Sequence, residues 1–118
     1  MPQFVLLVHE DEVAWSAGEQ AVRDRIVEQH YAFAEKHRDV LVAGNEFQST
    51  AVSVDVRGGE VAPSPAPAPG VAVPCGYFLV NADDIDHAVR IAEQIPMEFG
   101  YVQVRPVQVW EPREAPAV

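Results

Sequence analysis

The histidine at position 30 is the side chain of this sequence best suited to acid–base chemistry. An imidazole titrates near neutral pH, so it can take up and release a proton under physiological conditions. The segment around it carries apolar residues at helical spacing, namely Val22, Ile26 and Phe33. His30 falls on the shoulder of that stripe, which predicts a ring directed at a pocket between a helix and a sheet. The alternative is a buried structural histidine bonded to a backbone carbonyl.

Glu46 is the predicted catalytic partner of His30. It follows Ala43-Gly44-Asn45 near the end of a predicted strand, where functional side chains often collect. A carboxylate beside the ring would orient it and raise its pKa. The alternative is a solvated surface acid.

Arg105 and Gln103 are candidate substrate-binding residues on the last predicted strand. They share one alternation of that strand, and Val102 and Val104 occupy the other. If the valines face helices, the polar pair faces the interior of a barrel, and Arg105 would hold a carboxylate or phenolate of a ligand. The alternative is a salt bridge at a dimer interface.

Two aromatic residues complete the candidate substrate-binding set. Tyr77, in a predicted strand, would donate a phenolic hydrogen bond into a cavity, and Trp15 would lie over a pocket as a lid. The plainer alternatives are core packing for Tyr77 and a hydrophobic anchor before a helix for Trp15.

Neither a metal nor an organic cofactor is predicted. The run His-Glu-Asp-Glu at 9–12 contains ligand types, but its spacing does not fit one helix face and no second histidine lies at i+4. Gly58-Gly59 and Gly70 lie in the wrong context for a phosphate loop or a dinucleotide fingerprint. The single cysteine, Cys75, excludes a disulfide framework, and we expect a buried, inert thiol.

The composition favours one acidic domain that binds neither nucleic acid nor a membrane. A chain of 118 residues, 48% of them apolar, suffices for one modest core. Its formal net charge of −10 argues against nucleic acid and against an anionic membrane surface. The apolar start at 4–8 lacks a basic flank, so we do not expect it to be a signal peptide. We therefore expect a soluble, cytoplasmic protein.

The elements that must position these residues follow from the hydrophobic pattern. We expect strands over 3–9, 40–43, 51–57, 76–81 and 101–110. We expect a first helix over 16–38, with Ser16 and Glu19 at capping-box spacing, and a second from Asp83 or Asp84 to Pro96. Gly58-Gly59 predicts a hairpin turn.

The chain is predicted to form one domain over residues 1–112, with a proline-rich surface loop over 62–74 and a flexible tail over 113–118. The order β-α-β-β-β-α-β predicts an α+β sandwich of ferredoxin-like type with both helices on one face of the sheet. An uncovered apolar face is a liability in a monomer, so we expect a second copy to cover it in a homodimer.

Several short segments within residues 3–110 share a pattern with one known family. They are Phe4–Val8, His30 with Tyr31 and Phe33, Val40–Gly44, Gly76–Asp83, Asp86–Pro96 and Val102–Val107. Together they resemble the YCII-related proteins, especially the subgroup named for an Asp-Gly-Pro-Phe motif. The resemblance implies a ferredoxin-like subunit that dimerises into an α+β barrel.

The same resemblance implies a small, cofactor-free protein. One such relative is a dehydrochlorinase that acts on a chlorinated hydroxyquinol. A histidine of the first helix and an acidic residue after the second strand are the proposed catalytic pair of the family, and His30 matches the histidine. This sequence departs from the family in two places: 62–70 replaces the motif, and Asn45-Glu46 stands where the aspartate is expected.

The function expected from these residues and this resemblance is cofactor-independent acid–base chemistry by His30. The reaction would be an elimination, an isomerisation or another lyase-type step on a small cyclic or aromatic metabolite. One alternative is a non-catalytic dimer that binds a metabolite or a partner protein. A further alternative is a quinone-forming monooxygenase, because such enzymes share the barrel architecture.

Overall fold

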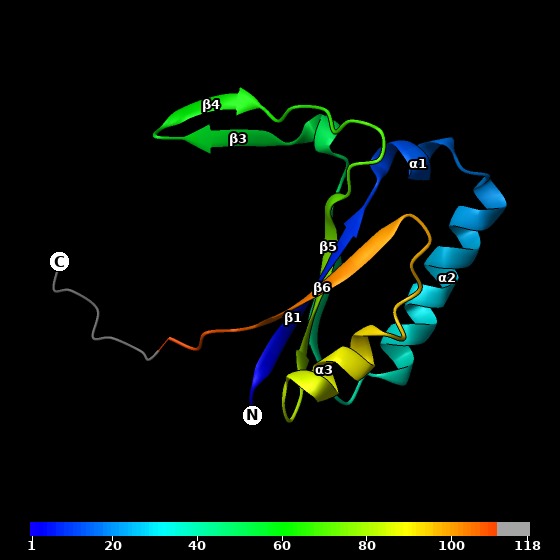
Figure 1. Cartoon of the computed structure of the whole chain (residues 1–118), viewed down its shortest axis with the longest axis vertical. Coiled ribbons are helices and arrows are strands. Elements are labelled where there is room, and N and C mark those ends of the chain that lie inside the picture. Colours follow the sequence, from blue (N-terminus) through cyan, green and yellow to red (C-terminus); the bar gives the residue numbers. More distant parts are fainter. Residues whose placement is uncertain (111–118) are drawn as a thin grey trace, which may run out of the picture.

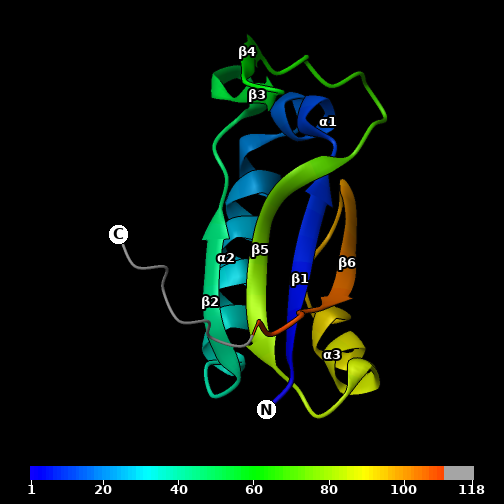
Figure 2. The ribbon, with the colours of Figure 1, turned by 90° about the vertical axis from the view of Figure 1, so that its left-hand side faces the viewer.

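A computed structural model describes residues 1–110 and centres on an antiparallel sheet of four strands. The strands lie in the order β2-β5-β1-β6, so the two inner strands are neighbours in space but distant in sequence (Figure 2). Their bounds are β1 Gln3–Glu10, β2 Leu41–Glu46, β5 Val73–Asn81 and β6 Gly100–Pro106. The architecture is α+β, as the sequence predicts, and it is compatible with a ferredoxin-like fold.

Two helices, α2 (Gln20–Lys36) and α3 (Ile85–Ala92), cover one face of this sheet, and the other face carries no helix (Figure 1). A shorter helix, α1 (Glu12–Ala17), connects β1 to α2. Alternate residues of β1 are buried beneath the helices, and the largest side chains of that core are Phe4, Leu6 and Phe33. None of the helices in residues 1–110 is long and apolar enough to cross a membrane.

The strand register determines which side chains face away from the helices. Leu7 lies opposite Tyr77 of β5 and Gln103 of β6. Val5 lies in the same way between Leu79 and Arg105. The open face thus has an apolar centre on β1 and β5 and a polar margin on β6.

The prediction of a capping box formed by Ser16 and Glu19 is wrong. Asp11 caps α1 instead, since its Oδ1 accepts from the backbone N–H of Ala14 at 3.1 Å, and Ser16 lies inside that helix. Glu19 precedes α2 but makes no side-chain capping bond. The Arg23 guanidinium donates to carbonyls at the C-terminal end of α1, including that of Trp15 at 3.1 Å. These bonds satisfy carbonyls that are left without helical partners where the chain breaks between the two helices.

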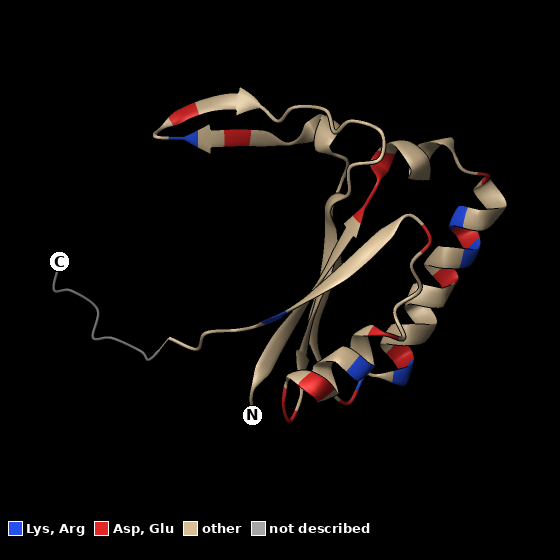
Figure 3. Cartoon of the chain, viewed as in Figure 1, with Lys and Arg blue, Asp and Glu red and all other residues tan. Residues whose placement is uncertain are grey.

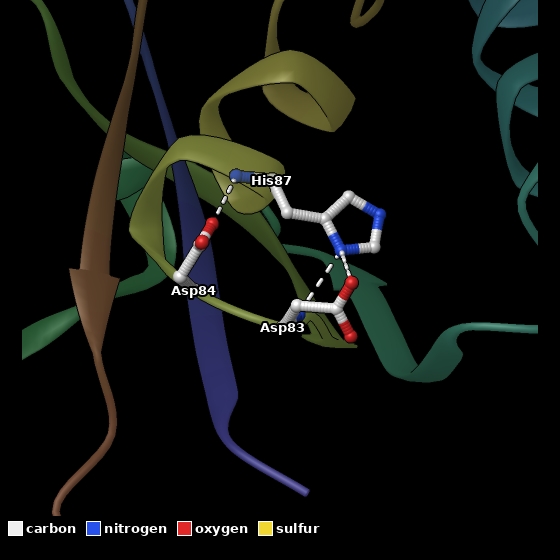
Figure 4. Close-up of polar contacts among 3 residues, drawn as sticks. All are labelled: Asp83, Asp84 and His87. Carbon is white, nitrogen blue, oxygen red and sulfur yellow. Dashed lines mark hydrogen bonds and ion pairs between the residues drawn. The ribbon is translucent and has the colours of Figure 1, made fainter.

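The predicted cap of the second helix is confirmed at Asp84. Its Oδ1 accepts from the backbone N–H of His87 at 2.8 Å, and the Asp83 N–H donates to His87 Nδ1 at 3.0 Å (Figure 4). The carboxylate of Asp83 also lies 3.6 Å from the same nitrogen. These contacts satisfy backbone donors at the start of α3, so His87 has a structural role.

The predicted hairpin turn is also confirmed. Gly58 and Gly59 have φ values of 56° and 85°, which suit a tight two-residue turn between β3 (Val54–Arg57) and β4 (Glu60–Pro63). A 3-10 turn over Thr50–Val52 replaces the start of the strand expected at 51–57. The hairpin forms its own sheet and projects beyond the end of the main sheet (Figure 1).

The proline-rich connection is shorter than expected, because β4 extends through Pro63 and β5 begins at Val73. One contact ties it to the body of the domain: the Gly70 N–H donates to Asp11 Oδ2 at 2.8 Å. The last strand ends at Pro106 rather than at residue 110. The tail predicted over 113–118 lies outside the described residues.

Candidate functional site

A pocket of about 740 Å³ lies between α2 and the edge of the sheet formed by β2 and β5, with α1 at one end. Four of the six predicted site residues line it: His30, Glu46, Trp15 and Tyr77. The pocket exists because the helical layer is incomplete here. Ile26 and Phe33 of α2 are buried, whereas most of β2 beyond Leu41 stays exposed.

The His30 ring is half-buried and held from two sides. Its Nε2 lies 3.1 Å from the carbonyl oxygen of Pro96, to which the neutral Nε2–H tautomer donates. Its ring stacks on Phe78 with centroids 6.1 Å apart and an interplanar angle of 17°. The Nδ1 atom makes no hydrogen bond within residues 1–110, and no partnerless side-chain nitrogen or oxygen in that range is buried. This nitrogen is therefore accessible on a residue that lines the pocket.

Burial lowers the pKa of His30 below its ordinary value, because the charged imidazolium loses solvation. The Pro96 carbonyl and the charge of Glu46 act in the opposite direction but are weaker. The ring is therefore neutral at pH 7. Its Nδ1 then carries a lone pair that can accept a proton.

Glu46 lines the same pocket, but it does not bond to His30. The expected contact between the carboxylate and the ring is thus not formed, and the backbone carbonyl of Pro96 orients the ring instead. Glu46 acts on His30 only through its charge, which favours the protonated ring. It is an exposed side chain on the last residue of β2.

Two further acids and a thiol lie at the same end of the pocket. Both oxygens of Glu12 accept from Thr50, from its N–H at 3.0 Å and from its hydroxyl at 2.6 Å. Burial raises the pKa of Glu10, and repulsion from Glu46 and Glu12 adds to this, while a hydrogen bond with Cys75 opposes it. Burial and the neighbouring Glu10 raise the pKa of Cys75 to about 12.

The sequence did not lead us to expect that this acidic end would form part of a ligand-binding pocket. Its signal is the run Glu10-Asp11-Glu12, weighed above only for metal binding. No group of three or more His, Cys, Asp or Glu side chains in residues 1–110 has an arrangement that could hold a metal ion. The pairing of β1 with β5 shifts between Val8 and His9, so that Cys75 has no partner in the register and Glu10 lies opposite Val73.

Two glycines shape the floor of the pocket. A Cβ on Gly44 would lie 2.9 Å from Cδ1 of Phe78, so the absence of a side chain lets the Phe78 ring lie against β2. A Cβ on Gly76 would lie 2.9 Å from the backbone oxygen of Asn45. Both positions therefore hold β2 and β5 in close contact below His30.

The two aromatic candidates occupy different places. Trp15 lines the end of the pocket near α1 and packs edge-on against Phe99, with ring centroids 6.1 Å apart. Tyr77 contributes to the lining, but the register directs its ring to the open face, where its hydroxyl accepts from Asn45 Nδ2 at 3.2 Å. The expected hydrogen bond from Tyr77 to a ligand stays a prediction, and its hydroxyl is bonded to Asn45 in the structure.

Arg105 and Gln103 do not line the pocket. The valines of β6 do face the helices, as the sequence suggests, and the polar pair consequently lies on the open face beside Val5 and Leu7. Both side chains are exposed. Any ligand in the pocket of this chain is therefore held without Arg105.

The structure thus joins His30, Glu46 and Trp15 around one cavity and separates them from Arg105 and Gln103. Comparison with known proteins found no protein-family model and no curated protein that matches the chain.

Proposed function

We propose that the pocket binds a small cyclic or aromatic molecule and that His30 acts in it as a general base through Nδ1. The observation that supports this is the state of the ring. Its Nε2 is bonded to the Pro96 carbonyl, whereas its Nδ1 is accessible and has no partner within residues 1–110. A neutral imidazole fixed at one nitrogen and free at the other suits proton abstraction.

The proposed step needs no cofactor. A proton from an activated C–H bond of the substrate moves to Nδ1, and the electron pair of that bond stays on the substrate as an enolate or carbanion. The Pro96 carbonyl and the charge of Glu46 stabilise the imidazolium that forms. Return of the proton to another atom gives isomerisation, and loss of a leaving group gives elimination.

We also propose that the protein is a homodimer joined through the open face of the sheet. Val5, Leu7 and Leu79 lie at the centre of that face without a covering helix. The resemblance to YCII-related proteins implies the same arrangement. Sedimentation at micromolar concentration should give twice the chain mass of 12.9 kDa, and a monomer would contradict the proposal.

Ligand binding without turnover is the second candidate. It is favoured by the absence of a direct contact between His30 and Glu46, since most histidine bases are oriented by a carboxylate. The two candidates differ in one measurable property, which is proton transfer.

Hydrogen exchange into trial substrates measures that property without knowledge of the final product. The protein would be incubated in D2O with cyclic and aromatic compounds that carry an activated C–H bond, and the loss of each proton signal followed by NMR. We expect catalysed exchange with the natural chain. His30→Gln should slow it by about 10²-fold, the usual contribution of a general base.

His37→Gln is the matched control, because His37 lies at the end of α2, outside this pocket, and bonds to Gln94. It should leave the exchange rate unchanged. Binding of a compound without exchange would favour the non-catalytic candidate. Equal exchange by the natural chain and His30→Gln, with both folded, would overturn the role of His30.

A further inference from the structure

The charged side chains that line the pocket are all acidic. Its lining contains Glu10, Glu12 and Glu46 but neither lysine nor arginine. The strands that form its floor and inner end, β1, β2 and β5, carry none of these basic residues, as Figure 3 shows. His30 is the one lining residue able to become a cation, and burial keeps it neutral at pH 7.

Within residues 1–110, none of the carboxylates of this end forms an ion pair. Glu12 is satisfied by Thr50, but Glu46 has no hydrogen-bond donor in that range. Burial raises the pKa of Glu10, and the charges of Glu46 and Glu12 add to this effect. A positive charge placed among these groups would relieve their repulsion.

The rest of the lining suits the apolar or aromatic part of a ligand. Ile26 and Phe78 line the pocket together with His30. The aromatic residues Trp15, Tyr31 and Phe47 also belong to its lining. The faces of such rings attract organic cations as well as apolar groups. The volume of about 740 Å³ is in the range of small-molecule sites.

We propose that the ligand of this pocket is a compact organic cation, a protonated amine with an apolar or aromatic body. Its ammonium group lies beside Glu46 and Glu10, and its body packs against Phe78 near His30. This inference rests on the proposed function, since it names the ligand class of the same pocket. The inference excludes carboxylate and phosphate ligands, because the lining would present them with three carboxylates and neither lysine nor arginine.

Three probes of nearly equal size and different charge test the proposal: 2-phenylethylamine, 2-phenylethanol and 3-phenylpropionate. Binding to the full chain would be measured by calorimetry, and its place by the shift of the His30 ring signals in NMR. We expect the amine to bind about tenfold more tightly than the alcohol, as for one charge-assisted hydrogen bond. The carboxylate should bind more weakly than either.

Glu46→Gln separates charge from shape. It should remove most of the preference for the amine over the alcohol and leave affinity for the alcohol unchanged. Glu60→Gln, on the projecting hairpin, is the matched control and should change neither.

A carboxylate that binds as tightly as the amine would overturn the inference, as would a preference that survives Glu46→Gln. Absence of binding by all three probes would also overturn it. None of these results decides the role of His30, because deuterium exchange by His30→Gln tests that separately.

Discussion

The two faces of the central sheet place neighbouring residues of β1 in different environments. Leu6 and Leu7 are consecutive and identical in type, yet Leu6 is fully buried under the helices, whereas Leu7 is half-buried on the open face. The covered face makes a core where the helices lie close to the sheet, and a pocket where α2 diverges from the β2 edge. Chemistry becomes possible where the covering layer is incomplete but not absent, because a side chain there is both held and accessible.

The same contrast holds within α2. Phe33 is buried in the core, and His30, one turn earlier, lies at the wall of the pocket and stacks on the same Phe78 ring that Phe33 contacts. The core thus holds one side of the site. Within the described residues, Arg105 on the open face has no such support, and its side chain is exposed.

Leu6→Ala and Leu7→Ala give the largest expected contrast between the two faces. Leu6→Ala should lower the free energy of unfolding by about 2–5 kcal/mol, because it leaves a cavity in a packed core. Leu7→Ala should act chiefly on association, so its cost should depend on protein concentration. Urea unfolding at two protein concentrations measures both. Equal losses independent of concentration would mean that the open face has no partner.

The thiol of Cys75 tests the acidic end of the pocket. Since its pKa is raised to about 12, the reactive thiolate is scarce at pH 8. After allowance for the greater intrinsic reactivity of a high-pKa thiolate, alkylation by iodoacetamide should be about 10²-fold slower than in the urea-unfolded chain. Glu10→Gln should speed the folded-state reaction. A folded protein that reacts as fast as the unfolded chain would contradict the environment described for this end.

Gly44→Val tests the close packing of β2 against the Phe78 ring. A Cβ at this position would lie 2.9 Å from that ring, so the substitution should cost about 1–3 kcal/mol of stability. Ala43→Val, one residue earlier and paired with Leu79 of the open face, is the control and should cost less. Thermal unfolding measures both. A harmless Gly44→Val would show that Phe78 can leave the floor of the pocket.

The smallest expected effect concerns how the free energy of unfolding changes with pH. His30 should make it rise with pH, and Glu10 should make it fall. The pKa of His30 is lowered by burial, so its contribution to stability is complete above the unfolded value of 6.5 and is lost as pH falls through the folded pKa. The pKa of Glu10 is raised by burial, so its contribution is complete below the unfolded value of 4.5 and is lost as pH rises through the folded pKa.

Urea unfolding between pH 4 and pH 7.5 separates these two contributions. His30→Gln should flatten the loss of stability just below pH 6.5, and Glu10→Gln should remove the decline above pH 4.5. Both effects are limited because both groups are half-buried. If the stability of a variant changes with pH in parallel with that of the natural chain, folding does not shift the pKa of the substituted group.

Features set by neighbours along the chain could be predicted from the sequence. The Asp84 cap, the turn at Gly58-Gly59 and the alternation of β1 each depend on residues within a few positions of one another. The capping box at Ser16 failed although its spacing was correct. Asp11 caps an earlier helix, and Arg23 reaches back to its last carbonyls.

The sequence by itself determined the order along the chain of the four main-sheet strands and the two covering helices, the helical stripe beside His30 and the acidic net charge. Only the tertiary structure decided that Pro96, 66 positions away, holds Nε2, and that Glu10 meets Cys75. It also decided that Arg105 faces away from the pocket. The physical reason is that helical and strand periodicities act over a few residues, whereas these contacts depend on strand register and on where α2 leaves the sheet.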